Sequence, residues 1–202
     1  MTNEQRNILN FIMENKKVIE EIINTSPKEK LAKDLEFGES IRCAGITWSK
    51  FTEDNDGNAY MLADEKIVNM KFGENNDWRE SFIREKLNGY LFQNIKENLG
   101  ADALVTIHTD LFSHDGLRDY GKCDDMVSLL TYDLYRNNRE NIKSIKDFWW
   151  LATPNSTPSG YGSVGVQIVH SNGCVSYFWC VGYGAVRPFF ILKSSIFVSN
   201  SY

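Results

Sequence analysis

The last quarter of the chain is almost free of charge. From Phe148 to Tyr202 the only Asp, Glu, Lys or Arg residues are Arg187 and Lys193, whereas charged residues make up 24% of the whole sequence. The segment is rich in glycine, serine and aromatic residues, and the runs WWLAT, SVGVQIVH, CVSYFWC and VRPFFIL are short and apolar. Because bundled helices do not tolerate that glycine content, the pattern predicts short strands joined by turns such as Ser171-Asn172-Gly173.

Strands are also expected earlier in the chain. Apolar residues alternate on both sides of Asp56-Gly57, which predicts a hairpin within residues 36–70. The runs at 103–112 and 126–131 alternate in the same way and predict two further strands.

Helices are predicted over residues 3–24 and 77–98 and in TYDLYRNNRENIKSIKD, with a break at Asn88-Gly89. The apolar stripe of the first helix is interrupted by Asn15, where coiled coils often carry a polar residue. Two interpretations of this helix stay open: it packs on its own domain, or it joins copies of the chain as an oligomerisation helix. We expect an N-terminal helical segment over residues 1–30 and one domain over residues 31–202.

The bulk composition limits the partners. The formal net charge is −5 and the pI is near 5.3, which argues against a basic face for nucleic acid. The sequence has no apolar run long enough to span a membrane, and its N-terminus lacks the apolar core of a signal peptide. We therefore expect synthesis in the cytoplasm without membrane insertion. The four cysteines form no C-x-x-C pair and are expected to be reduced thiols.

The stretch GYGSVG, Gly160 to Gly165, has the G-x-G-x-x-G spacing of nucleotide-binding loops. A dinucleotide fingerprint needs a helix after the glycines. Here VQIVHSNG follows, which predicts a strand and a turn, and the lysine of a Walker loop is absent. The glycines are therefore expected to serve tight turns or to leave space on a surface.

Two groups of acidic and histidine residues have side chains of the types that bind metal ions. Asp54, Asp56 and Glu65 resemble a calcium loop, but Ala59 stands where the loop needs glycine. His108, Asp110, His114 and Asp115 could hold a metal or form a solvated loop, and the sequence favours the loop, with His170 at the surface. No catalytic residue, metal site or cofactor is predicted.

Several landmarks appear in a fixed order: WRESFIREKLN (78–88), MVSLLT (126–131), FWWLATP (148–154) and AVRPFFIL (185–192). As a set they resemble a bacterial and phage domain family of unknown function with a W-W-L segment and a closing G-V-R-P, although residue 185 is Ala here. The resemblance covers residues 36–198. It implies an α+β, C-type-lectin-like fold, similar to that of the formylglycine-generating enzyme group, with an irregular antiparallel sheet and two main helices.

Variable proteins of diversity-generating retroelements share this fold and closing motif. In them, mutated Asn codons give residues such as Tyr, Phe, Ser, Cys, Gly and Ala, but cannot give Trp, Gln, Lys, Glu or Met. In the region 160–186 only Gln167 and Trp179 are unreachable in this way. The resemblance implies these ligand-binding residues: Tyr161, Ser163, Gly165, Tyr177, Phe178, Cys180, Gly182, Tyr183, Gly184 and Ala185. The alternative is an ordinary family member whose β-rich end is simply neutral.

The implied function is recognition of a protein or cell-surface ligand by a diversified surface, on a virion or on a cell. Two alternatives stay open: a metal-dependent oxidase of the formylglycine-generating type, for which Cys174 and Cys180 are the only close pair, and a structural virion component. Catalysis is not expected.

Placements of individual side chains are also expected. Trp149 is expected in the core and Trp150 at the rim, or the reverse. One of Phe178 and Trp179 is expected in the core, with Phe178 on the display side under the retroelement interpretation. Arg187, with Pro188, is expected to have a structural role.

Overall fold

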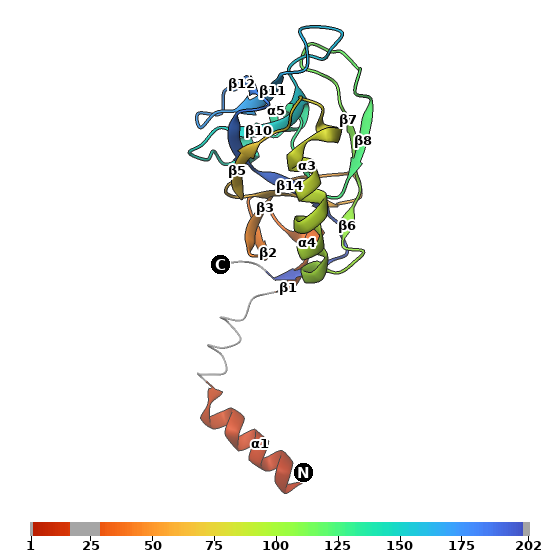
Figure 1. The fold of residues 1–202 in the computed structure, drawn as a ribbon. Coiled ribbons are helices and arrows are strands. Elements are labelled where there is room, and N and C mark those ends of the chain that lie inside the picture. The colour runs from red at the N-terminus through yellow and green to blue at the C-terminus, as the bar shows by residue number, and fades with distance from the viewer. Residues whose placement is uncertain (1, 17–28, 200–202) are drawn as a thin grey trace.

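The computed structural model describes residues 2–16 and 29–199 of the chain. These residues form a mixed α+β protein in which sheets predominate and helices are few (Figure 1). The α+β class expected from the sequence is therefore confirmed.

The larger sheet of the domain has six strands. Its order is β2 (Ser40–Cys43), β3 (Ile46–Glu53), β4 (Ala59–Ala63), β14 (Pro188–Leu192) and β6 (Leu104–Val105), and β9 (Ser128–Leu129) also pairs with β14. The turn from β3 to β4 contains Gly57 with φ of 73°, a conformation that favours glycine, so the predicted hairpin is confirmed.

A five-stranded sheet holds most of the uncharged C-terminal segment. Its order is β12 (Val175–Trp179), β11 (Gly165–Val169), β10 (Trp149–Pro154), β13 (Tyr183–Val186) and β5 (Val68–Lys71). β12 is an edge strand that pairs with β11, and the two lie at the end of the molecule away from β1 and β2 (Figure 1). The predicted strands are confirmed, and residues 183–186, expected in the display region, add β13.

Two smaller pairs complete the sheets of the described residues. β1 (Glu29–Leu31) pairs with β15 (Phe197–Ser199), which joins the two ends of the domain. Glu29 and Lys30 therefore belong to the domain and not to the N-terminal helical segment. β7 (Ile107–Asp110) pairs with β8 (Lys122–Asp125).

The helix expected over residues 77–98 consists of four consecutive pieces. They are the 3-10 turn η2 (Trp78–Glu80), α3 (Phe82–Lys86), the π-helical turn η3 (Leu87–Leu91) and α4 (Phe92–Leu99). Asp77 caps η2 and Ser81 caps α3, each accepting a hydrogen bond from a backbone N–H in the following turn. The π-helical turn falls at Asn88-Gly89, the predicted break.

Three shorter helices lie elsewhere in the domain. α5 (Tyr132–Asn137) begins after Thr131, whose side chain accepts a hydrogen bond from the Leu134 N–H. It is followed by the 3-10 turn η4 (Arg139–Asn141), and a further 3-10 turn, η1 (Ala32–Asp34), follows β1.

The core is built around buried tryptophans. Trp48, Trp78, Trp149 and Trp150 are all buried, and Ile83, Leu87, Leu91 and Ile95 bring the α3–α4 face into the same core. Trp149 and Trp150 point to opposite faces of β10 and pack into two different hydrophobic clusters. The expectation that one of them lies at the rim is therefore wrong, because both faces of β10 are covered.

Helix α1 (Asn3–Glu14) is the described part of the N-terminal helical segment. A capping box between Thr2 and Gln5 starts it, and Asn15 is its C-cap. Ile8 and Phe11 are exposed, so these two side chains of the predicted stripe do not pack on the domain. The remainder of the expected helix, from residue 17 to 24, lies outside the described residues. No helix in the described ranges has the length and apolar character needed to cross a membrane.

Candidate ligand-binding surface

Exposed aromatic side chains gather around the edge strand β12. Tyr161 is 94% exposed, Tyr177 53%, Phe178 39%, Trp179 65% and Tyr183 66%. We call these five residues the aromatic surface. Val164 and Val181, which flank β11 and β12, are exposed as well. Buried positions are the usual place for rings of this size, so the exposure of this group is the feature of the molecule that needs a functional explanation.

The register of β12 distributes its rings over both faces of the sheet. Tyr177 lies opposite Gln167 and Trp179 opposite Gly165, and both point to one face. Phe178 points to the other face, where its ring contacts those of Phe148 and Trp150 at centroid distances of 5.2 and 6.0 Å.

The expectation that Phe178 or Trp179 lies in the core is wrong, because both side chains are exposed. The physical reason is the position of β12. An edge strand has a neighbouring strand on one side alone, and no residue of β12 is buried.

Tyr161 lies on a loop that hydrogen bonds from Asn76 hold to the domain. The buried Asn76 side chain donates to the carbonyls of Ser156 at 2.9 Å and Gly165 at 2.7 Å. The Asn76 N–H donates to the Ser163 carbonyl at 2.9 Å, and the Tyr120 hydroxyl donates to the Asn76 side-chain oxygen at 2.6 Å. Asn76 therefore fixes both ends of the loop, and the Tyr161 ring projects into solvent from a held backbone.

Two aspartates fasten the same loop from its other side. Asp119 accepts hydrogen bonds from the Thr157 hydroxyl at 2.7 Å and the Ser159 N–H at 3.1 Å, and these bonds lower the pKa of its carboxyl. Hydrogen bonds from the Ser113 and Ser156 hydroxyls lower the pKa of Asp115. Both carboxylates are thus held ionised at the root of the loop.

The small residues of the predicted site support the rings and do not display side chains. Gly165, Cys180, Gly184 and Ala185 are buried, and Ser163 and Gly182 are half-buried. A Cβ on Gly184 would lie 2.7 Å from the Trp150 ring and 2.9 Å from the Phe148 ring, and one on Gly182 would meet the Phe178 ring. Of the ten predicted residues, Tyr161, Tyr177, Phe178 and Tyr183 are therefore brought to the surface as expected.

Sequence reasoning missed Trp179. It set this residue aside because a Trp codon cannot arise from a mutated Asn codon, yet Trp179 is among the most exposed rings of the surface. The signal that could have found it is the run Tyr177-Phe178-Trp179, because three consecutive rings on one strand cannot all face a single core.

The cysteines do not form the pair that an oxidase would need. All four are free thiols. Cys174 precedes β12 and Cys180 follows it, so about 20 Å of extended strand separates them. Cys180 is buried, and burial raises the pKa of its thiol. Together these findings place the two sulfurs apart and leave Cys180 a protonated thiol.

The histidines, aspartates and glycines that resembled metal or nucleotide sites in the sequence have ordinary structural contacts. His108 contacts Asp124 at 2.8 Å and Asp110 pairs with Lys122 at 3.1 Å, while His170 is exposed, as expected. Gly165 begins β11, so a strand and not a helix follows the glycine motif, as predicted. Within the described residues no group of three or more His, Cys, Asp or Glu side chains is placed to hold a metal ion.

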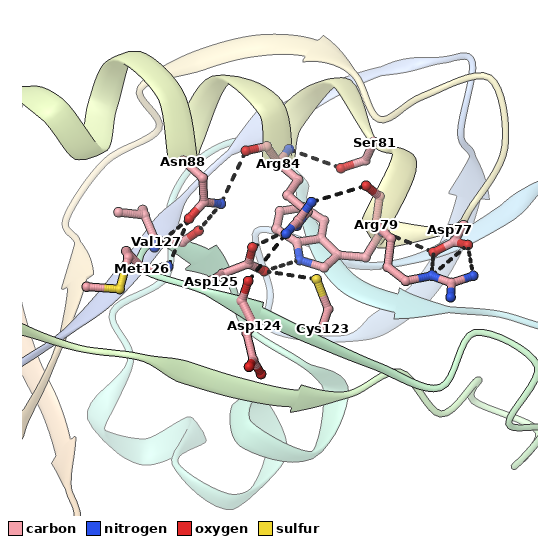
Figure 2. A network of polar contacts seen from close by, with 11 residues as sticks. Asp77, Arg79, Ser81, Arg84, Asn88, Cys123, Asp124, Asp125, Met126 and Val127 are labelled. Carbon is pink, nitrogen blue, oxygen red and sulfur yellow. Dashed lines mark hydrogen bonds and ion pairs between the residues drawn. The ribbon is translucent and has the colours of Figure 1, made fainter.

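A buried polar network links α3 to β8 (Figure 2). Asp125 accepts hydrogen bonds from Trp78 Nε1 and Arg84 Nε, each at 2.7 Å, and Figure 2 shows Arg84 directed toward it. Asn88 donates to the Val127 carbonyl at 2.9 Å and accepts from the Met126 and Val127 N–H groups. Each of these polar groups is satisfied by a neighbour in the protein, so the network is a structural clamp.

The chain was compared with protein-family models, with curated proteins and with solved structures, and none of them matches it. Its function is therefore inferred from its own sequence and from the geometry of the surface.

An open groove of about 870 Å³ lies between β7, α5 and β14 and is a second candidate site. Tyr60 and Phe189 stack on one another in its floor. Its carboxylates already have partners: Asp110 pairs with Lys122, Asp133 with Arg136, and Asp54 accepts from the Asn58 amide at 2.9 Å. The carboxylates of the groove are thus already engaged by neighbouring side chains, and the aromatic surface remains the stronger candidate.

Proposed function

We propose that the protein recognises another protein, or a ligand on a cell surface, through the aromatic surface. One observation carries the proposal: five rings are exposed on adjoining segments of a chain region whose exposed side chains carry no charge. Contiguous apolar patches on soluble proteins mark interaction sites. A neutral patch also avoids the cost of burying unpaired charge when a partner covers it.

The composition of the surface suits recognition. Tyr and Trp offer large contact areas with few rotatable bonds, so little entropy is lost when a partner immobilises them. Trp179 and Tyr177 lie side by side on one face of β12, where a partner could bury both rings. Rings of this kind dominate measured binding energies in protein interfaces.

The C-type-lectin-like fold and membership of the bacterial and phage family belong to the same proposal. The ordered landmarks support it because several of their residues make hydrogen bonds that hold the domain together. Trp78, Arg84 and Asn88 belong to the α3–β8 network, and the guanidinium of Arg187 donates to the carbonyls of Ala63 and Lys143. The exposed rings lie on segments between these landmarks, which is the arrangement that a fixed scaffold with a changeable surface requires.

A retroelement-type diversification would act on the exposed positions alone. Tyr161, Ser163, Tyr177, Phe178 and Tyr183 have side chains that reach the surface wholly or partly. The buried positions of the predicted set, Gly165, Cys180, Gly184 and Ala185, are constrained by packing. Sequencing the neighbouring DNA tests this proposal: a reverse transcriptase and an imperfect, Asn-codon-rich copy of the 160–186 region are expected. Their absence would leave an ordinary family member or a structural virion component.

Alanine substitution tests the binding role directly. Peptides selected from a random display library on the immobilised full chain serve as the probe. Trp179→Ala is expected to weaken their binding by about thirtyfold, the effect of losing one aromatic anchor worth about 2 kcal/mol. Tyr90→Ala is the control, because Tyr90 is also an exposed ring, at 79% against 65% for Trp179, but lies on η3, outside the surface. Equal loss in both variants would contradict a specific site at the aromatic surface.

A further inference from the structure

The edge strand β12 offers backbone groups as well as rings. It is the last strand of its sheet and pairs with β11 alone in the described part of the chain. The pairing is unbroken from Gly165–Trp179 to Val169–Val175, without a bulge. The far side of β12 is therefore a straight row of main-chain N–H and C=O groups.

The hydrogen bonds at the two ends of the ladder show which residues point outward. Cys180 N donates to the Val164 carbonyl at 2.8 Å, and His170 N donates to the Cys174 carbonyl at 2.9 Å. Hydrogen-bonded and non-bonded pairs alternate along an antiparallel ladder. The main-chain groups of Val175, Tyr177 and Trp179 therefore point away from β11.

These outward groups are open to a partner. The Trp179 carbonyl accepts from the Gly182 N–H at 2.8 Å, in the turn that follows the strand. Within the described residues no hydrogen bond engages the N–H or C=O of Tyr177 or the N–H of Trp179. The two most exposed rings of β12, those of Tyr177 and Trp179, thus belong to residues that also carry outward main-chain groups without a partner.

The edge also lacks the usual protection. Proteins shield edge strands with lysine, proline, inward charges or bulges that prevent pairing with other chains. The sequence of β12 is VSYFW, and its residues other than Val175 are exposed. A strand left open in this way is suited to pairing with another strand.

We propose that the partner binds as an extended polypeptide segment that adds to β12 as a new edge strand. This inference rests on the proposed function and gives it a partner class. Backbone hydrogen bonds to Tyr177 and Trp179 would supply affinity, and the rings of Tyr177 and Trp179 on one face and Phe178 on the other would select alternate side chains. The segment would be apolar or aromatic at these positions and uncharged, matching the neutral edge.

A second copy of this chain is a poorer occupant on electrostatic grounds. Each copy carries a formal net charge of −5, so pairing two copies edge to edge brings like charges together. A neutral segment of a different protein meets no such repulsion, which is why we commit to a foreign strand.

The first test modifies the backbone of the probe and leaves the protein unchanged. A peptide selected on the full chain and sensitive to Trp179→Ala is synthesised in two forms, N-methylated at odd or at even positions. Because a strand directs alternate N–H groups to its neighbour, one form should lose binding by roughly tenfold or more. The other form should retain it. Equal tolerance of both forms would overturn strand addition.

The second test removes one outward donor from the protein. Tyr177→Ala removes the ring alone, whereas Tyr177→Pro removes the ring and the N–H, at a position where the β11 ladder needs no donor. Tyr177→Pro should bind the same peptide roughly three- to tenfold more weakly than Tyr177→Ala. Thermal unfolding of both variants checks that the domain stays folded. If Tyr177→Pro does not fold, the N-methylated peptides alone decide whether the partner adds as a strand.

The outcomes separate the two proposals. Loss of binding in Trp179→Ala, with equal affinity for both N-methylated peptides, would retain the aromatic surface as the binding site and overturn the added strand. Peptides that are all insensitive to Trp179→Ala would overturn both. A concentration-dependent dimer in sedimentation, abolished by Tyr177→Pro, would show that the occupant is a second copy and overturn the foreign strand.

Discussion

Packing against rings, more than turn geometry, explains two glycines of the C-terminal segment. Gly182 lies under the Phe178 ring, and Gly184 lies under the rings of Trp150 and Phe148. The resemblance placed both glycines among the ligand-binding residues, as products of mutated Asn codons. It could not identify the rings, because Trp150 and Gly184 are neighbours only in the folded sheet.

A matched pair of glycine substitutions tests this explanation. Gly184→Ala is expected to lower the free energy of unfolding by about 1–3 kcal/mol, because the new methyl group overlaps the Trp150 ring. Gly89→Ala, in η3, places its methyl group in open space and should raise the free energy of unfolding by about 0.5–1 kcal/mol. Urea unfolding measures both. Similar stability of the two variants would contradict the packing role of Gly184.

Arg187 shows how far a single residue could be understood from the sequence. Its structural role was predicted and is confirmed: its guanidinium donates to the carbonyls of Ala63 at 2.7 Å and Lys143 at 2.8 Å. It also lies over the Trp149 ring at 5.3 Å. Burial lowers the pKa of Arg187 to about 10, so the side chain stays charged at neutral pH. The identities of its carbonyl partners come from distant segments, which no local pattern reveals.

At the scale of elements, strands and helices were largely predictable because their patterns are local. The hairpin at Gly57 and the strands β10, β11 and β12 follow from alternation and turn residues. The order of strands in each sheet did not follow, since β14 inserts beside β4 and β13 beside β5 through long-range pairing. The exposure of β12 depends on this order, so the sequence could predict the strand but not its position at the edge of the sheet.

The α3–β8 clamp can be tested with two neighbouring aspartates. Asp125→Asn should lower the free energy of unfolding by about 2 kcal/mol, because the amide keeps one acceptor oxygen and sets an NH2 group against the other of the two donors, Trp78 Nε1 and Arg84 Nε. Asp124→Asn is the control: its contact with His108 is exposed and should contribute less than about 0.5 kcal/mol. Chemical unfolding compares the variants, and equal stabilities would show that Asp125 does not clamp α3.

At the scale of the whole molecule, the loop that carries Tyr161 and the core are held by different contacts. The core depends on buried rings and on the α3–β8 clamp, whereas the loop carrying Tyr161 depends on Asn76, Asp115 and Asp119. Regions of a protein supported by different contacts can open independently. Acid should therefore loosen the loop before it unfolds the domain.

The sign of this pH effect follows from the carboxyl pKa values. Asp115 and Asp119 have pKa values below the ordinary 3.8, so their anchoring bonds are fully present above pH 3.8 and are lost as the pH falls below it. Backbone NMR relaxation of Ser159 and Tyr161 should report increased motion below pH 3.8 while the signals of β10 stay unchanged. Asp119→Ala should show that motion already at neutral pH. A loop of unchanged rigidity in this variant would contradict the anchoring role.

The hydrogen bonds from Asn76 to the loop affect which amino-acid substitutions the loop can accept during evolution. All three groups that it holds, from Ser156, Ser163 and Gly165, are main-chain oxygens. Every amino acid has a main-chain carbonyl oxygen, so these three hydrogen bonds do not depend on the side chains of the loop. Residues 161 and 163 can be rewritten by inheritance, or by an engineer grafting a new specificity, while the path of the loop is preserved.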